Sequence, residues 1–363
     1  MFSRRRTLGV DTICQVTKNV PEPSWFYSTS WKNERMHLRF ESHPDDSTSL
    51  QESIGRSALI RSVKPGNNLR YGDKLMPHSP AFILTLTCRD TVGIVAAVSG
   101  FLADCGGFIL DSQQYADLQA ERFFMRVEFS ANDPQSLHDI DEIRLRFKGV
   151  ADRFELDWVL TEAARRTKLL IAVSKASHCL NDLLFRWRTG GLPADIVGVV
   201  SNHDNLRNLA EWHGIPYYYL PIEAGSKTRQ EVDLLSLFNS TGADYLVLAR
   251  YMQVLSESFA CQLVDRCINI HHSFLPSFKG ARPYHRAHER GVKLIGATAH
   301  FVTSDLDEGP IIEQDVERVD HRATEEDLIR LGRDIEARVL ARAVHWIGER
   351  RVFLNGLRTV VFR

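Results

Sequence analysis

The chain has 363 residues, enough for two or three domains, and its charges nearly balance at a formal net charge of -1. Hydrophobic residues make up 44% and charged residues 25%, which is ordinary for a globular protein. A chain with so small a net charge has no net electrostatic attraction to nucleic acid or to an anionic membrane. No apolar run is long enough for a membrane-spanning helix. We therefore expect neither as a partner.

The six cysteines are scattered and form no C-x-x-C pair. Disulfide frameworks and structural zinc sites use closely spaced cysteines, so the sequence predicts neither. This pattern is typical of a reducing compartment, and we expect the protein in the cytoplasm.

Residues 1–79 differ from the rest of the chain. They carry twelve Lys and Arg against eight Asp and Glu, and they show no sustained apolar face. We interpret them as a poorly structured extension. Two other interpretations stay open. In the first, translation starts at Met76 and the earlier residues are an artefact. In the second, Arg4, Arg5 and Arg6 begin a mitochondrial transit peptide within residues 1–30.

From residue 80 the pattern becomes regular. Apolar stretches and helical spacing predict two helices among four strands, with strands at 82–88, 108–115, 123–129 and 154–160 and helices at 94–102 and 136–148. The order βαββαβ is the split βαβ arrangement of ferredoxin-like folds.

Together with Arg-Asp-x-x-Gly-Ile-Val at the first turn, this order resembles an ACT domain, which we place at residues 80–163. The resemblance implies a homo-oligomer assembled through this domain and an amino-acid effector bound near Asp90 and Gly93. A purely structural module for dimer formation is the alternative.

Beyond a charged linker at 161–168, strands and helices alternate. Strands are predicted at 169–174, 196–201, 217–220, 245–248 and 267–270, and helices near 180–188, 205–212, 229–240 and 324–346. This alternation predicts a Rossmann-like, mostly parallel sheet covered by helices, at residues 164–363. Ligands of such sheets bind beyond the carboxyl ends of the strands.

Two apolar strands run into polar segments near those ends. One ends in Asn269-Ile-His271, and the other leads from Phe301 into a loop that carries Asp307. An amide, an imidazole and a carboxylate that meet can polarise a carbonyl, hold its oxyanion and move a proton. Each residue alone fits a turn or loop role better, but the three together favour a site.

The motifs Asn-Ile-His-x-Ser-x-Leu-Pro and His-Phe-Val-Thr-x-x-Leu-Asp-x-Gly-Pro resemble the formyltransferase family that uses 10-formyltetrahydrofolate. The resemblance implies that Asn269, His271 and Asp307 are catalytic. Residues 248–256 resemble the folate-pocket strand and turn of that family. The implied folate-binding residues are Met252, Gln253, Val254, Leu255, Thr303, Ser304 and Asp305.

The acceptor of the formyl group depends on departures from the family pattern. Residues 174–178 read Ser-Lys-Ala-Ser-His where the glycinamide ribonucleotide transformylases have a glycine-rich, phosphate-binding turn. An ACT-like domain placed before the catalytic half resembles instead the layout of the formyltetrahydrofolate deformylase family. The motifs Arg-Tyr-Met-Gln and His-His-Ser-Phe-Leu-Pro-Ser-Phe-Lys-Gly carry the same resemblance. This resemblance implies a hydrolase that releases formate for one-carbon and purine metabolism, with the folate as substrate and no permanently bound cofactor. A formyltransferase acting on a small amine and a non-catalytic folate or amino-acid sensor stay open as alternatives.

In the implied hydrolysis, water replaces the amine acceptor. Asp307 would take its proton, directly or through another water, while Asn269 and His271 stabilise the oxyanion. His271 as the general base is the competing assignment. We expect no metal, because the adjacent His271 and His272 would point to opposite faces of a strand and H-E-x-x-H is absent at His288.

Overall fold

The computed structural model describes residues 80–131, 139–223, 225–276 and 283–363. The extension expected at residues 1–79, with its alternative start at Met76, lies outside the described residues. Within the described ranges no helix is long and apolar enough to cross a membrane.

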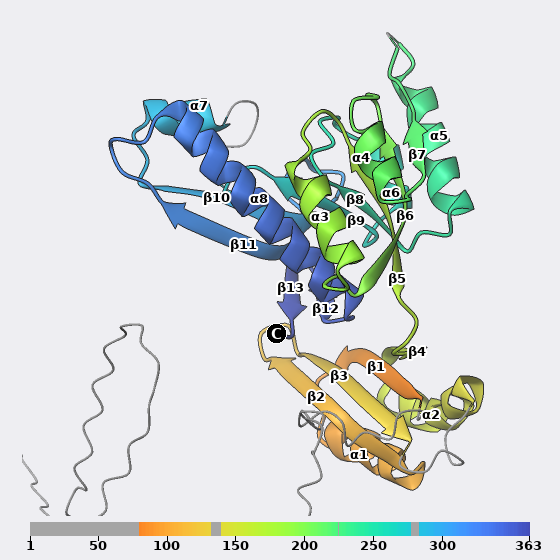
Figure 1. The fold of residues 1–363 in the computed structure, drawn as a ribbon. Helices are drawn as coiled ribbons and strands as arrows, with labels where there is room; N and C mark the ends of the chain where they lie inside the picture. Colours follow the sequence, from red (N-terminus) through yellow and green to blue (C-terminus); the bar gives the residue numbers. More distant parts are fainter. Residues whose placement is uncertain (1–79, 132–138, 224, 277–282) are drawn as a thin grey trace, which may run out of the picture. The chain divides into compact units, whose positions relative to one another are not determined.

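The first sheet has four antiparallel strands in the order β2-β3-β1-β4. They are β1 (Ala81–Arg89), β2 (Gly107–Asp117), β3 (Arg122–Ala131) and β4 (Asp157–Glu162). Helices α1 (Ile94–Asp104) and α2 (Ile140–Phe154) bury their apolar side chains against one face (Figure 1). The element order βαββαβ is the one expected from the sequence.

Helix α2 differs from its prediction at both ends. The prediction ended it at Lys148, but it continues through Gly149 to Phe154. A helical glycine costs only about 1 kcal/mol relative to alanine, and the buried Ala151 beyond it supports the added turn. Leu145, assigned to the apolar face, is 74% exposed. Residues 136–138 of the expected helix lie outside the described part of the chain.

The linker expected at 161–168 is shorter than predicted. Thr161 is buried in β4, and Thr167 is buried at the start of β5 (Thr167–Val173). Both threonines are β-branched and suit a strand, so the charged residues between them make up the connection.

The second face of the four-stranded sheet contacts a C-terminal hairpin that the sequence did not predict. The hairpin consists of β12 (Val352–Asn355) and β13 (Arg358–Val361). The Phe124 and Phe353 rings lie 6.0 Å apart, and the buried Arg126 donates from Nε to the Glu349 carbonyl at 3.0 Å. Asn355 also donates to Asp117 at 2.6 Å. Strand β3 is therefore covered on both faces.

The second sheet has seven strands in the order β11-β10-β9-β8-β5-β6-β7. Strands β5 to β9 pair in parallel, and β10 and β11 are antiparallel additions at one edge. This is the mostly parallel, Rossmann-like sheet expected. Beyond β5, its strands are β6 (Ala194–Ser201), β7 (Tyr217–Tyr219), β8 (Tyr245–Leu248), β9 (Cys267–His271), β10 (Leu294–Phe301) and β11 (Ile311–Arg318).

Helices cover both faces of this sheet (Figure 1). One core is formed with α3 (His178–Arg188), α4 (Arg207–Trp212), α7 (Pro283–Glu289) and α8 (Glu325–Gly348). The other is formed with α5 (Lys227–Ser240) and α6 (Glu257–Gln262). The sequence predicted α3, α4, α5 and α8 but not the short α6 and α7.

Helix α8 is fixed at its start and along its length. Thr324 and Asp327 form a capping box, in which each backbone N–H is bonded by the other's side chain. Further along, Gly332 lies against the Tyr284 ring of α7. A Cβ at this glycine would sit 2.2 Å from the ring. These two contacts set both the register and the depth of α8.

Candidate active site

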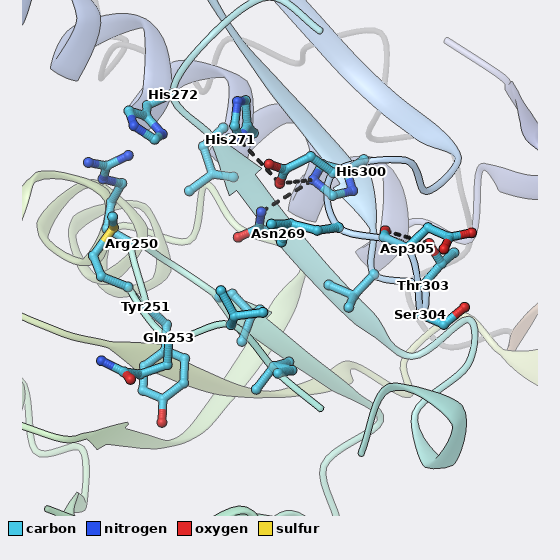
Figure 2. A pocket seen from close by; sticks show the side chains of 18 residues that line it. Arg250, Tyr251, Gln253, Asn269, His271, His272, His300, Thr303, Ser304 and Asp305 are labelled. Carbon is cyan, nitrogen blue, oxygen red and sulfur yellow. Dashed lines mark hydrogen bonds and ion pairs between the residues drawn. The ribbon is translucent and has the colours of Figure 1, made fainter. Parts of the chain in front are cut away.

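A pocket of about 280 Å³ lies where the segment after β8, strand β9 and the loop after β10 come together (Figure 2). The three residues expected to be catalytic all line it: Asn269, His271 and Asp307. So do all seven residues expected to bind the folate: Met252, Gln253, Val254, Leu255, Thr303, Ser304 and Asp305.

Asn269 lies inside β9, within the strand predicted at 267–270, and the strand is one residue longer than predicted. It stands opposite Leu248 of β8 and His300 of β10. The strand continues to His271 because β10 pairs with it up to that residue. The pocket therefore opens beside the last residues of β9 rather than only beyond them.

His271 and Asp307 form a buried pair. His271 Nδ1 lies 3.2 Å from Asp307 Oδ1. Burial by itself raises the pKa of Asp307, but the hydrogen bond and the electrostatic attraction from His271 outweigh burial, so the net pKa is lowered. Asp307 is therefore ionised at neutral pH. His271 Nε2 is buried and has no hydrogen-bond partner among the described residues, so it is available to a bound molecule.

The backbone of the loop after β10 brings Asp307 to this place. Phe301 N donates to the Pro310 carbonyl at 2.9 Å, which closes the loop. Gly309 lies against the same turn, where a Cβ would be 1.8 Å from the Phe301 carbonyl oxygen. Asp307 itself has a φ of 59°, a left-handed conformation that aspartate adopts more readily than most residues. Gly309 and Pro310 of the motif thus help to hold the Asp307 carboxylate in the pocket.

His300 orients the amide of Asn269. His300 Nδ1 lies 2.8 Å from the Phe301 carbonyl oxygen, so this nitrogen carries the proton. Burial lowers the pKa of His300 and keeps the ring neutral, which leaves Nε2 as an acceptor. Asn269 Nδ2 donates to that nitrogen at 3.2 Å. The second N–H of the amide is then free to donate to a substrate oxygen.

Residues 167–344 match the formyl transferase family. A formyltetrahydrofolate deformylase from Corynebacterium sp. (strain P-1) is 53% identical over 288 residues, which are 79% of this chain and 100% of that protein. One from Bacillus subtilis is 48% identical over 280 residues, 77% of this chain and 93% of that protein. The chain belongs to the formyltetrahydrofolate deformylase family.

Solved structures agree with this family assignment. A formyltetrahydrofolate deformylase from Burkholderia mallei is 54% identical, has a TM-score of 0.75 and covers 78% of this chain and 100% of its own. A glycinamide ribonucleotide transformylase from Symbiobacterium toebii is 30% identical, with a TM-score of 0.52. The match covers 95% of the transformylase but only 55% of this chain, a smaller part than the match to the deformylase covers.

The expectation that His271 and His272 point to opposite faces of a strand was wrong. His272 lies beyond the end of β9, so strand alternation does not separate it from His271. Both rings line the pocket, with centroids 5.1 Å apart. Burial, assisted by the charges of Arg250 and His271, lowers the pKa of His272 to about 4. His272 is therefore neutral at physiological pH.

The sequence did not identify three further polar residues of this region, namely His300, Arg250 and Glu336. His300 and Arg250 line the pocket, and Glu336 of α8 pairs with Arg250. A usable signal existed for the first two, because both stand inside the motif segments that carry the family resemblance. Glu336 had no such signal. It is one of many charged residues along α8, and only its burial distinguishes it.

Proposed function

We propose that this chain hydrolyses 10-formyltetrahydrofolate to tetrahydrofolate and formate. The single observation that carries the proposal is the convergence of Asn269, His271 and Asp307 on one pocket, with Asp307 ionised and bonded to His271. The relatives that support it are named for this reaction. Formate release in the absence of any amine acceptor tests it. Release only when an amine is added would instead favour a formyltransferase.

In the proposed mechanism, the water oxygen bonds to the formyl carbon and the bond from that carbon to N10 breaks. Asn269 donates its free N–H to the developing oxyanion, and His271 donates from Nε2. Asp307 favours the protonated form of His271 through Nδ1, and it accepts the proton of the attacking water. N10 takes up, as it leaves, the proton that Asp307 accepted from the water, and formic acid is the other product. In the competing assignment, a neutral His271 accepts the water proton at Nε2.

The folate is proposed to bind along the apolar wall of the pocket. Met252 and Val254 are 57% and 56% exposed, although both are apolar and line a pocket. Covering such surface with a ring system is favourable by about 25 cal/mol per Å². Ser174 Oγ accepts from Met252 N at 3.0 Å and fixes this segment. Met252→Asp should raise KM for the folate and leave the circular dichroism spectrum unchanged. An unchanged KM would contradict this placement.

We also propose that strand β2 joins two copies of the chain. It is an edge strand, paired only with β3 in its sheet, and it exposes Phe108, Ile109 and Tyr115. An unpaired edge with exposed apolar side chains favours pairing with another strand. Residues 80–363 should therefore form a larger oligomer than residues 164–363 in light scattering. Equal oligomers would contradict the proposal.

An amino-acid effector is proposed at the turn before α1. Gly93 has a φ of 98°, and Asp90 is exposed beside it. A side chain at Gly93 would strain this conformation and crowd a ligand that approaches the helix start. If an amino acid changes turnover, Gly93→Val should abolish that response while basal turnover persists. A folded Gly93→Val protein without basal turnover would contradict a purely regulatory role.

A further inference from the structure

A buried carboxylate connects the pocket to α8. Glu336 is 1% exposed; it accepts from the Tyr284 hydroxyl at 2.5 Å, and it lies 2.8 Å from His178 Nε2 and 3.2 Å from Arg250 Nε. Burial alone raises the pKa of Glu336, but these three partners outweigh burial and lower it. The carboxylate is therefore ionised, and Arg250 carries the charge opposite to it.

Arg250 has available donors in spite of this ion pair. Its side chain is only 15% exposed, yet Nε and Nη1 make no hydrogen bond to any described residue. The Nε–H group does not point at Glu336, although the two atoms are close. Arg250 also has a φ of 66°, which is uncommon for a side chain of this size. Buried unpaired donors and a left-handed backbone together mark a site that serves a ligand.

The charges around the pocket show which ligand chemistry fits. Arg250 is the only lysine or arginine among the described residues that line the pocket. Figure 2 shows its guanidinium extending toward His272, on the wall beside His271. Asp307 is already negative. An anion formed near that carboxylate is repelled by it, and Arg250 offers the compensating positive charge.

A metal ion is a poorer occupant of this region. His178, Cys179 and Glu336 have ligand atoms within 4.8 Å of one another. Burial raises the pKa of the Cys179 thiol well above its ordinary value, so the thiol stays protonated. Glu336 is already paired with a guanidinium, which would repel a cation.

We propose that Arg250, held in place by Glu336, binds the carboxylate of formate as hydrolysis produces it. This inference rests on the proposed hydrolysis. Once the bond from carbon to N10 has broken, the product is formic acid, which loses its proton to water and becomes an anion. The unpaired N–H groups of Arg250 then donate to its oxygens as charge-assisted hydrogen bonds. Glu336 acts as a positioning residue through Arg250.

Product inhibition by sodium formate tests the proposal, with sodium chloride at equal ionic strength as the control. Arg250→Met should raise the formate inhibition constant at least about tenfold, since hydrogen bonds to charged groups contribute strongly to binding. Arg250→Lys should fall between that variant and the original protein, because lysine keeps the charge without the planar donors. An unchanged inhibition constant in Arg250→Met would overturn the proposal. So would a lowered kcat with unchanged formate inhibition, which would assign Arg250 to the attacking water.

Loss of Arg250 leaves the buried Glu336 carboxylate without its guanidinium partner, and this can prevent folding. Arg250→Met combined with Glu336→Gln removes both charges and should fold, with the same loss of formate inhibition. Calorimetric titration of sodium formate into the tetrahydrofolate complex of each protein measures binding without turnover. Formate binding by the double variant as tight as by the original protein would overturn the proposal. Failure of the hydrolysis itself would appear separately, as no formate release by the unaltered protein.

Discussion

His271 Nδ1 and Asp307 Oδ1 lie 3.2 Å apart, although one comes from a strand and the other from a loop beyond the next strand. The contact fixes the orientation of the imidazole ring and leaves Nε2 for the substrate. It also keeps the carboxylate ionised. One pair thus presents an unpartnered imidazole nitrogen and an ionised carboxylate to the same pocket, as the proposed mechanism requires.

Substitution of the three residues proposed to be catalytic should remove hydrolysis but not the fold. Asn269→Ala, His271→Ala and Asp307→Asn should each lower kcat at least about a hundredfold, as is typical when one oxyanion donor is removed. Steady-state formate release and circular dichroism measure the two effects. Glu308→Gln, in the same loop but outside the pocket lining, is the matched control and should stay near the original rate. Near-original activity in Asp307→Asn would rule out the proposed mechanism.

The variant His271→Gln should distinguish the two roles of His271. An amide N–H can donate to the oxyanion, but an amide does not accept the proton of the attacking water. If His271 is a donor, His271→Gln should therefore keep more activity than His271→Ala. If His271 is the base, the two variants should be equally slow. Steady-state formate release measures the difference, and we expect the first result. Equal rates for the two variants would establish the competing assignment.

His300 should act on catalysis mainly through Asn269, because its Nε2 lies 3.2 Å from Asn269 Nδ2 and farther, at 3.9 Å, from Asp307 Oδ1. His300→Leu removes the acceptor for Asn269 Nδ2 and should lower kcat several-fold, about the effect of one hydrogen bond. In the Asn269→Ala background, the same change should have little further effect on kcat. A double-mutant cycle measures this coupling. Additive losses would show that His300 acts by another route.

His272 should make the fold sensitive to acid. Its pKa is lowered to about 4, so between pH 6.5 and 4 the unfolded chain binds a proton that the folded protein does not. Stability is therefore lost as pH falls through this range, by on the order of 3 kcal/mol. The facing charges are Arg250, His271, Glu336 and Asp307.

His272→Asn should remove most of this loss. Urea unfolding at pH 7 and pH 4.5 measures it, and His321→Asn at an exposed position is the control. Equal acid sensitivity of His272→Asn and the original protein would contradict the assignment.

A chain beginning at Met76 should fold and hydrolyse the folate with unchanged kcat. The composition of residues 1–75 does not support a packed core, and the Corynebacterium relative aligns over its whole length with only 79% of this chain. Thermal unfolding and steady-state kinetics of the shortened protein give the answer. A large drop in melting temperature would show that the extension contributes to the structure.

The sequence predicted the sheets and the location of the pocket better than the surroundings of its charged groups. Strand patterns predicted β5 and β9, because buried parallel strands are short, continuous apolar runs. The hairpin β12–β13 was missed, because each strand has four residues and its packing against β3 is not visible locally. Glu336 was missed for a similar reason. A glutamate in a long helix is usually solvated, and its role depends on Arg250 from a distant segment.

The capping box of α8 bears on how this region of the chain can vary. The cap at Thr324 and the close contact of Gly332 with Tyr284 set where Glu336 faces. One inserted residue between the cap and Glu336 would rotate the carboxylate by about 100° and move it by about 1.5 Å, away from Arg250. Substitutions on the solvent-exposed side of α8 between Thr324 and Glu336 leave the direction of the Glu336 carboxylate unchanged. The number of residues between Thr324 and Glu336 is therefore constrained more strongly than their identity.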